Sequence, residues 1–278
     1  MPLPRGRRPG PTVRARVTEV RGDRTITHED RLVTEEPLEL RLQAPGLPGT
    51  RLGITMRTPG NDFELAAGWT VHEGISPPDG IIGVRYCTDV DLLPEQEFNV
   101  VTVELAAPPL RLPSAHVASS ACGVCGGDSV RDVLADRPPS LRGTTSLSVA
   151  VVHRLAASLR DAQEAFSRTG GLHAAGLFET DGTRVVVRED VGRHNAVDKV
   201  VGARVLAAEG IPPVLVLSGR VGFELVQKAV VCGIEAIVAV GAPSSLAVEL
   251  AQQAGLLLVG FSRDERFVTY AGRERLGV

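Results

Sequence analysis

Short apolar runs alternate with helical patterns over the second half of the chain, and this alternation restricts the possible folds more than any other feature. The runs VLVLSG, AIVAV and LLLVGF alternate with patterns typical of helices over 194–208, 222–231 and 245–254. Uninterrupted apolar runs of this length are typical of parallel strands that are covered on both faces. Before them, AAGLFET and RVVVRED flank the pair Asp181-Gly182, which favours a hairpin turn. We therefore predict an α/β half in which a hairpin precedes βαβ units. A helix over HRLAASLRDAQEAFSRTGG is predicted to precede that hairpin.

The first half is predicted to be rich in β-strands. Five segments carry alternating apolar residues or β-branched residues: VRARVTEV, LVTEEPLELRL, TRLGITMRT, IIGVRYCTDV and FNVVTVELA. One helix interrupts them; Asn61 or Asp62 can cap it, and it runs to Gly74. The whole chain is thus α/β, or α+β overall, with four predicted parts: a tail over 1–10, a β-rich domain over 11–110, a connecting segment over 111–145 and an α/β domain over 146–278.

Composition and charge exclude several classes of protein. With 278 residues, 43% apolar residues and a net charge of −3, the chain is typical of a soluble globular protein. Nucleic-acid binding needs a broad basic face, which this charge balance does not provide. No apolar stretch reaches the roughly 18–20 residues that span a bilayer, and no apolar core follows Arg7-Arg8 as it does in an export signal. We therefore expect a cytoplasmic protein with no nucleic-acid and no membrane partner.

Two of the four cysteines form a CxxC motif whose surroundings favour thiol chemistry. Cytosolic thiols stay reduced, and Cys87 and Cys232 lie in apolar patterns where they would pack as small hydrophobic side chains. Cys122 and Cys125 lie instead in ASSACGVCGG, whose small residues favour an exposed, mobile loop. A helix predicted to start near Asp128 would direct its positive end towards both thiols and favour their thiolate forms. This combination predicts a nucleophilic thiol that can carry sulfur as a persulfide.

Two alternatives for the CxxC motif are open at this point. A structural zinc site would need a second pair of ligands, and the sequence contains no further CxxC, HxxxH or CxxH pattern. A thioredoxin-type dithiol is the stronger alternative, although that motif normally lies where a strand meets a helix in a small βαβ domain. Here the motif lies in a long connection of small residues, which suits a carrier that visits two partners.

Polar residues gather where the predicted strands of the second half end. One strand ends in Asp190, and Arg193 and His194 then open a helix. The carboxyl ends of buried strands are where α/β proteins bind ligands. Three later strands also end in turns. Two of these turns bring Gly or Ser to a helix N-terminus, and the third adds Arg263 and Arg266: Ser218-Gly219-Arg220, Gly241–Ser245 with Ser244, and Phe261–Arg266. Together the three turns favour a phosphate-binding cleft.

Two common types of site are excluded by their motifs. None of the turns has the GxxxxGK[ST] pattern of Walker-type NTPases. The H-x-E…P-C-x-x-C signature of zinc deaminases is missing too, although a hairpin followed by βαβαβ resembles their fold. In the first half, RTPGNDFEL is explained by a turn and a helix cap, except that Arg57 and Glu64 could face a cleft between the halves.

Six segments together carry a resemblance to a known family. They are RTPGNDFELAAGW (57–69), CGVCGG (122–127), TGGLHAAGLF (169–178), EDVGRHNAVDKVVG (189–202), LSGRVGFELVQKA (217–229) and GAPSSLAVELA (241–251). In these segments the chain resembles the formate dehydrogenase accessory sulfurtransferase family, the FdhD-type sulfur carriers. The resemblance extends from about residue 30 to the C-terminus. EDVGRHNAVDK is its most specific block, whereas a CxxC motif alone is not specific.

The resemblance implies a cytosolic homodimer with a cytidine-deaminase-like α/β C-terminal domain. It implies a sulfurtransferase that takes sulfur from a cysteine desulfurase and passes it to the molybdenum cofactor, a bis(molybdopterin guanine dinucleotide), before this cofactor is inserted into formate dehydrogenase. Cys122 would carry the persulfide, and Cys125 would assist. The family's cofactor-binding segment matches Phe261, Ser262, Arg263, Asp264, Glu265 and Arg266, where two acids replace the usual small residues.

The remaining residues predicted to bind the cofactor are Asp190, Arg193, His194, Ser218, Arg220 and Ser244, and no metal site is predicted.

The alternative function is a chaperone that binds the molybdenum cofactor without chemistry of its own, and a dithiol oxidoreductase is a third possible function. Sulfur transfer requires Cys122, the chaperone requires neither cysteine, and the oxidoreductase depends equally on Cys122 and Cys125.

Overall fold

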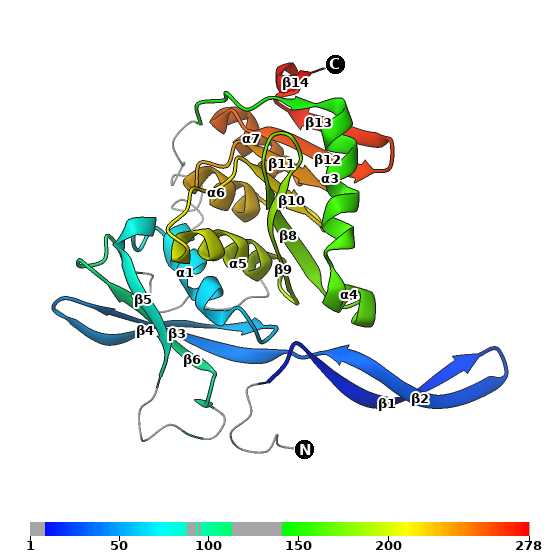
Figure 1. Cartoon of the computed structure of the whole chain (residues 1–278), viewed down its shortest axis with the longest axis horizontal. Coiled ribbons are helices and arrows are strands. Elements are labelled where there is room, and N and C mark those ends of the chain that lie inside the picture. Colours follow the sequence, from blue (N-terminus) through cyan, green and yellow to red (C-terminus); the bar gives the residue numbers. More distant parts are fainter. Residues whose placement is uncertain (1–8, 88–92, 94–95, 113–140, 278) are drawn as a thin grey trace.

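A computed structural model describes residues 9–87, 93, 96–112 and 141–277. Its helices and strands form a mixed α/β fold around two main sheets, as predicted (Figure 1). In chain order these elements are β1 (Thr12–Arg21), β2 (Arg24–Val33), β3 (Glu36–Ala44), β4 (Leu47–Arg57), α1 (Asp62–His72), β5 (Ile81–Tyr86), β6 (Val100–Leu105), β7 (Leu147–Ser148), α3 (Val149–Asp161), α4 (Glu164–Thr169), β8 (His173–Phe178), β9 (Arg184–Asp190), α5 (Arg193–Leu206), β10 (Val214–Leu217), α6 (Phe223–Val231), β11 (Ala236–Ala239), α7 (Ser245–Ala254), β12 (Leu257–Arg263), β13 (Arg266–Ala271) and β14 (Leu276–Gly277), with short 3-10 helices at Pro78–Gly80 and Arg273–Arg275.

Helices cover both faces of the six-stranded sheet of the second half, whose order is β13-β12-β11-β10-β8-β9. Strands β10, β11 and β12 are parallel, as the apolar runs predicted. Leu215 and Leu217 face the core formed with α5, α6 and α7, whereas Val214 and Val216 face the core formed with α3. Successive residues of β10 are therefore buried on opposite faces, which explains why this strand is apolar without alternation.

A four-stranded sheet with the order β4-β3-β6-β5 forms the first half. Leu38, Leu40 and Leu42 alternate along β3 and pack with Leu65 and Trp69 of α1. This strand pairs antiparallel with β4 and parallel with β6. Its alternating burial is the period-two pattern expected of a sheet with one covered face. Helix α1 is thus fixed between its own sheet and the second half.

Helices α1 and α5 cross where a glycine of each meets the other helix. A Cβ atom on Gly68 would overlap the carbonyl group of Asp198, and one on Gly202 would overlap the carbonyl group of Glu64. The two backbones are therefore in direct contact, which a side chain at either position would prevent. This crossing joins the two halves of the chain.

The β1–β2 hairpin extends away from both sheets as an arm (Figure 1). Its two ten-residue strands pair antiparallel from Thr12–Val33 at the base to Arg21–Arg24 at the tip. At the base, Val33 lies close to Gly171. None of the helices that the structure describes is long and apolar enough to cross a membrane.

Three predicted elements need correction. The single helix over HRLAASLRDAQEAFSRTGG is two helices, α3 and α4, because the carboxylate of Glu189 accepts hydrogen bonds from the backbone N–H groups of Ala165 and Phe166 and begins a new helix there. Asn61 does not cap α1 with its side chain; it adopts a left-handed conformation with φ 57°. LVTEEPLELRL is the end of β2 and most of β3 rather than one strand.

Candidate functional site

The predicted polar turns meet at one edge of the six-stranded sheet. Strands β10, β11 and β12 end at this edge with β9, while β8 and β13 begin there because they run in the opposite direction. The edge therefore collects Asp190, Ser218 and Gly241, together with His173 at the start of β8. The backbone N–H of Phe261 donates to the carbonyl of Gly241 at 3.2 Å, so neighbouring turns touch directly.

Glycines allow these turns to pack tightly. A Cβ atom on Gly241 would lie 2.7 Å from the backbone nitrogen of Arg220, and one on Gly219 would lie 3.1 Å from Nδ1 of His173. The Ser218 hydroxyl accepts a hydrogen bond from the backbone N–H of Ala174 at 2.8 Å, which ties the end of β10 to the start of β8. A side chain at position 241 would therefore force these two turns apart.

Basic side chains converge on the same edge. Arg193 Nε and His194 Nε2 are buried and have no hydrogen-bond partner among the described residues. Burial lowers the pKa of His173, and the positive charges of Arg193 and Arg220 lower it further. Two guanidinium groups beside polar atoms that have no partner among the described residues favour an anionic ligand such as a phosphate. The structure thus brings three of the predicted residues together: Arg193, His194 and Arg220.

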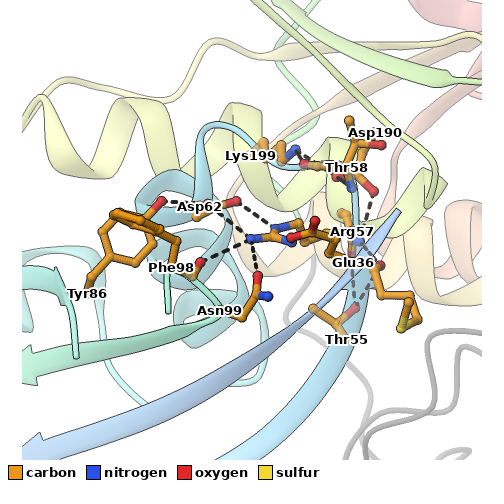
Figure 2. Close-up of polar contacts among 12 residues, drawn as sticks. Glu36, Thr55, Arg57, Thr58, Asp62, Tyr86, Phe98, Asn99, Asp190 and Lys199 are labelled. Carbon is orange, nitrogen blue, oxygen red and sulfur yellow. Dashed lines mark hydrogen bonds and ion pairs between the residues drawn. The ribbon is translucent and has the colours of Figure 1, made fainter. Parts of the chain in front are cut away.

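Asp190 is completely buried and links the two halves (Figure 2). Its carboxylate accepts hydrogen bonds from the backbone N–H groups of Thr58 and Gly192, at 3.1 and 2.8 Å, and from Asn195 Nδ2 at 2.9 Å. Lys199 Nζ lies 2.7 Å from the same carboxylate and donates to the carbonyl of Thr58 at 2.9 Å. Sequence reasoning predicted a ligand-binding role, whereas in the structure protein donors occupy this carboxylate, and Asp190 positions the start of α5.

Arg57 is the residue before Thr58, which contacts Asp190. Contrary to expectation, Arg57 does not face a cleft between the halves. It is completely buried, and its guanidinium donates to Asp62 at 3.0 Å and to Asn99 at 2.9 Å (Figure 2). The Tyr86 hydroxyl donates to the other oxygen of Asp62 at 2.6 Å. These bonds fix the backbone that leads into Thr58, and so they support the contact with the second half.

Glu64 does face the other half, as predicted. Its carboxylate accepts two hydrogen bonds from Arg188 of β9, at 2.6 and 2.7 Å. Donating these hydrogen bonds to Glu64 raises the pKa of Arg188. Bidentate pairs of this kind combine charge with fixed geometry, so this pair holds α1 against the edge strand of the sheet.

The segment 261–266 differs from the turn that was predicted after residue 260. Strand β12 continues to Arg263, and Arg263 pairs with Arg266 across a hairpin to β13. Phe261 is 38% exposed and has a positive φ of 52°, a conformation that is uncommon for a residue with a side chain. Ser262 is buried, whereas Arg263, Asp264, Glu265 and Arg266 are exposed.

Ser244 has a local role in the fold. Its hydroxyl accepts a hydrogen bond from the backbone N–H of Ala247 and caps α7. The turn before it lies beside the previous turn, since the backbone N–H of Val221 donates to the carbonyl of Ala242 at 3.1 Å. Backbone hydrogen bonds, which also include Ser244 N–H to the carbonyl of Val221 at 2.9 Å, thus hold these two turns of the site together.

A family model described as the FdhD/NarQ family matches residues 33–277, which is most of the chain. The chain belongs to the FdhD/NarQ family. Two similar relatives are named sulfur carrier protein FdhD. The relative from Nocardia farcinica is 46% identical over 272 residues, covering 95% of each chain, and the relative from Streptomyces coelicolor is 46% identical over 283 residues, covering 96% of each chain.

A solved structure supports the fold of this FdhD/NarQ family member. It is the crystal structure from Desulfotalea psychrophila that is described as a formate dehydrogenase accessory protein. The two structures superpose with a TM-score of 0.76 over 96% of this chain and 100% of that one, at 23% sequence identity. The agreement shows that the arrangement of sheets and helices is shared.

The two cysteines of the CxxC motif, Cys122 and Cys125, lie outside the described residues, as does the helix predicted near Asp128. A third cysteine, Cys232, lies at the end of α6, as predicted. Burial raises the pKa of Cys232 to about 12. Its thiol therefore stays protonated at neutral pH and is a poor nucleophile.

A third polar cluster in this FdhD/NarQ family member was missed by sequence reasoning. His72 Nδ1 and Lys228 Nζ each lie 2.5 Å from the same oxygen of the buried Asp198. Burial raises the pKa of Asp198, but the charge of Lys228 and the hydrogen bond with His72 outweigh burial and lower this pKa below its ordinary value. One signal was available: Lys199 and Lys228 are the only lysines of the sequence, and both lie in apolar helical patterns, where a cation needs a buried partner.

The protonation of His194 should make the stability of the fold depend on pH. Burial, reinforced by the charges of Lys228 and Arg193, lowers the pKa of His194 to about 4. The unfolded chain titrates this group near 6.5 and so binds more protons between these two values. The free energy of unfolding should therefore fall as the pH is lowered from about 6.5 to about 4. We expect His194 to account for about 2 kcal/mol of this loss, with solvent screening allowed for.

Urea unfolding at pH 7 and at a pH near 4.5 measures this loss. The variant His194→Gln cannot titrate, and its stability should fall by correspondingly less over the same interval. Equal losses in both proteins would assign the effect to other groups, such as His72 and His173, whose pKa values are also lowered by burial.

Proposed function

We propose that this FdhD/NarQ family member is a cytoplasmic sulfurtransferase that matures formate dehydrogenase. In this proposal Cys122 accepts sulfur from a cysteine desulfurase and passes it to the molybdenum cofactor, a bis(molybdopterin guanine dinucleotide), before that cofactor enters formate dehydrogenase. The observation that carries the proposal is 46% identity, over nearly the whole chain, to relatives named sulfur carrier protein FdhD. The CxxC motif at 122–125 provides the thiols that such a carrier needs.

Two thiols at this spacing, together with a dithiol reductant, give a balanced transfer. The thiolate of Cys122 attacks the outer sulfur of the desulfurase persulfide, so that a new S–S bond forms on Cys122 and the desulfurase cysteine leaves as its thiolate. The Cys125 thiolate then attacks Sγ of Cys122. This step forms a Cys122–Cys125 disulfide and releases the outer sulfur as sulfide to the acceptor. A dithiol reductant restores both thiols for the next cycle.

The edge of the six-stranded sheet fits a phosphate-rich substrate. Arg193 and Arg220 supply positive charge there, and Arg193 Nε and His194 Nε2 are buried polar atoms without a hydrogen-bond partner among the described residues. Arg263 and Arg266 add two exposed guanidinium groups at the hairpin of the same edge. Guanidinium groups bind phosphates in bidentate geometry, so these residues would hold the two nucleotide ends of the cofactor as substrate.

Mass spectrometry of the intact chain tests the sulfur-transfer step. After incubation with a cysteine desulfurase and cysteine, the wild-type chain should gain the mass of one sulfur atom, which a reductant then removes. Cys122→Ala should lose this gain and fail to support formate dehydrogenase activity. Cys232→Ala is the matched control, since its buried thiol is not nucleophilic, and it should behave like the wild type.

The same variants separate the alternatives. Full formate dehydrogenase activity with Cys122→Ala/Cys125→Ala would contradict the proposal and favour a cofactor chaperone without chemistry. Disulfide reductase activity that depends equally on Cys122 and Cys125, without added sulfur, would favour a dithiol oxidoreductase. Retention of the added sulfur by Cys122→Ala would show that another cysteine carries it.

A further inference from the structure

A cavity of about 550 Å³ lies between the two halves of the chain, beside strand β9. Its walls come from the start of β1, the turn before α1, helix α4 and β9. Pro59, Leu172 and Lys199 are buried lining residues, whereas Glu164 and Arg168 are exposed. Cavities of roughly 300–1,000 Å³ that combine apolar walls with a few polar groups are typical ligand sites. The polar groups of this cavity therefore indicate which ligand fits it.

Strand β9 presents its backbone to the cavity. Among the described strands, β9 pairs only with β8. The carbonyl and the N–H group of Ala174 in β8 bond to Ser218 at the end of β10, at 3.0 and 2.8 Å. Its cross-strand partner Glu189 therefore directs its own N–H and carbonyl away from β8, and so does Val187 two residues earlier. Both residues line the cavity, so two N–H groups about 7 Å apart lie along its wall.

The acceptors beside these N–H groups are already used by the protein. Nη1 of Arg188 donates to the carbonyl of Val187 at 2.9 Å, and Lys199 Nζ donates to the carbonyls of Thr58 and Glu189 at 2.9 and 3.4 Å. The Glu189 carboxylate accepts the two N–H groups that begin α4. The N–H groups of Val187 and Glu189, by contrast, have no acceptor among the described residues. The wall therefore offers hydrogen-bond donors to a ligand.

Arg168 of α4 adds a cation that a ligand can reach. The other basic side chains of the lining, Arg188 and Lys199, are engaged in the carboxylate pairs described above. The Arg168 side chain is 58% exposed and lies 3.8 Å from Glu164, which is 82% exposed. An exposed pair at this distance contributes little to stability, so the guanidinium can exchange it for the carboxylate of a ligand. The cavity thus favours a ligand that is acidic and rich in acceptors.

The spacing of the donors matches an extended peptide. Every second carbonyl of an extended chain points the same way, with a repeat of about 7 Å. We propose that the cavity binds an extended acidic segment of a partner protein, which adds a strand beside β9 and directs a carboxylate at Arg168. Backbone hydrogen bonds supply the affinity of such strand addition, and side chains supply its specificity. This binding goes beyond the proposed sulfur transfer and does not depend on it.

The N-terminal segment of the chain is a competing occupant. Residues 1–8 precede Pro11, which lines the cavity. Their sequence, MPLPRGRR, contains three arginines and no acidic residue. Such a segment would bring like charge to Arg168 and carries no carboxylate side chain to pair with it. Charge complementarity therefore favours an acidic segment of another protein.

Fluorescence anisotropy with a labelled six-residue peptide of alternating valine and glutamate tests the binding. The full chain should bind this peptide with a dissociation constant below about 1 mM, and the corresponding valine–lysine peptide at least tenfold more weakly. Arg168→Glu should reverse this preference. Arg154→Glu is the matched control, since Arg154 is an exposed arginine of α3 that is not part of the cavity lining. Its dissociation constants should change less than twofold.

Hydrogen exchange followed by NMR tests the added strand. The glutamate peptide should slow the exchange of the Val187 and Glu189 amides at least tenfold, because their N–H groups then have acceptors. The amide of Arg188 faces β8, where Arg188 pairs with Ala175, and its exchange should change less than twofold.

Filling the cavity should prevent both effects. Ala165 of α4 lines the cavity, and Ala165→Leu should weaken binding of the glutamate peptide at least tenfold. Ala157→Leu, at an exposed position of α3 outside the lining, is its control and should bind like the wild type. Thermal unfolding of each variant verifies that the fold is intact.

Several results would overturn the proposal. They are a wild type that leaves the glutamate peptide unbound at about 1 mM, equal effects of Arg168→Glu and Arg154→Glu, and binding that does not slow exchange at Val187 and Glu189. Displacement of the bound peptide by a synthetic MPLPRGRR peptide would identify the N-terminal segment of the chain as the occupant instead.

Discussion

Replacing Asp190 by asparagine should lower the free energy of unfolding by about 3–5 kcal/mol. Asp190 is completely buried, and the Lys199 ammonium, 2.7 Å away, is 1% exposed. The amide keeps the shape of the side chain but removes its charge, so the cation is left in a buried site without its counter-charge. Small domains are stable by only about 5–15 kcal/mol, and so this single change should consume a large part of the stability.

A double-mutant cycle separates the ion pair from the other bonds of Asp190. In Lys199→Met the carboxylate keeps its hydrogen bonds to Thr58 and Gly192 but loses its cation. The double variant Asp190→Asn/Lys199→Met leaves no unpaired charge, and so it should lose less stability than the sum of the two single changes. Urea unfolding measures all three.

An exposed ion pair provides the control for this cycle. Glu164 and Arg168 lie 3.8 Å apart on the surface of α4, where an i,i+4 pair contributes about 0.3–0.5 kcal/mol. Glu164→Gln should therefore cost less than about 0.5 kcal/mol. A loss of similar size in Asp190→Asn would contradict the assignment of Asp190 as the link between the halves.

The sequence predicted the second half well because its signals are local. Strand β10 is a run of four fully buried apolar residues, and α7 begins at a Ser cap and ends at Gly255. Because these strands were predicted to be parallel, their carboxyl ends were expected at the same edge of the sheet. Ser218, Gly241 and Phe261, which follow those ends, were therefore expected to lie close together. The strand RFVTYA was not predicted, although its aromatic and β-branched residues follow a possible two-residue turn at Asp264-Glu265.

The errors come from contacts that connect distant residues. Glu189 begins helix α4 by accepting hydrogen bonds from Ala165 and Phe166, which lie 24 and 23 positions earlier in the chain. His72 and Asp198 are 126 positions apart. Asp190 was predicted to bind a ligand because it lies at the carboxyl end of a buried strand, and the sequence could not show that Thr58 and Lys199 contact its carboxylate. A single sequence contains no pattern that specifies such partners.

Replacing Gly202 by alanine should destabilise the fold by about 3 kcal/mol, although alanine is the better residue within a helix. The added methyl group would overlap the carbonyl of Glu64 in the facing helix. Backbone cannot move aside as a side chain can, so α1 and α5 must separate. That separation would also weaken the Glu64–Arg188 pair. Urea unfolding should show the loss as a lower midpoint.

At a glycine outside the helix crossing, replacement by alanine should not lower the free energy of unfolding. A Cβ atom on Gly210 would meet nothing within 4 Å, so Gly210→Ala should be neutral or should stabilise the chain by up to about 1 kcal/mol. Gly68→Ala enters the same contact from the other helix and should cost as much as Gly202→Ala. Because the helices need to separate only once, Gly68→Ala/Gly202→Ala should cost clearly less than the sum. Additive losses would mean that the two glycines act independently, and that this crossing is not what joins the halves.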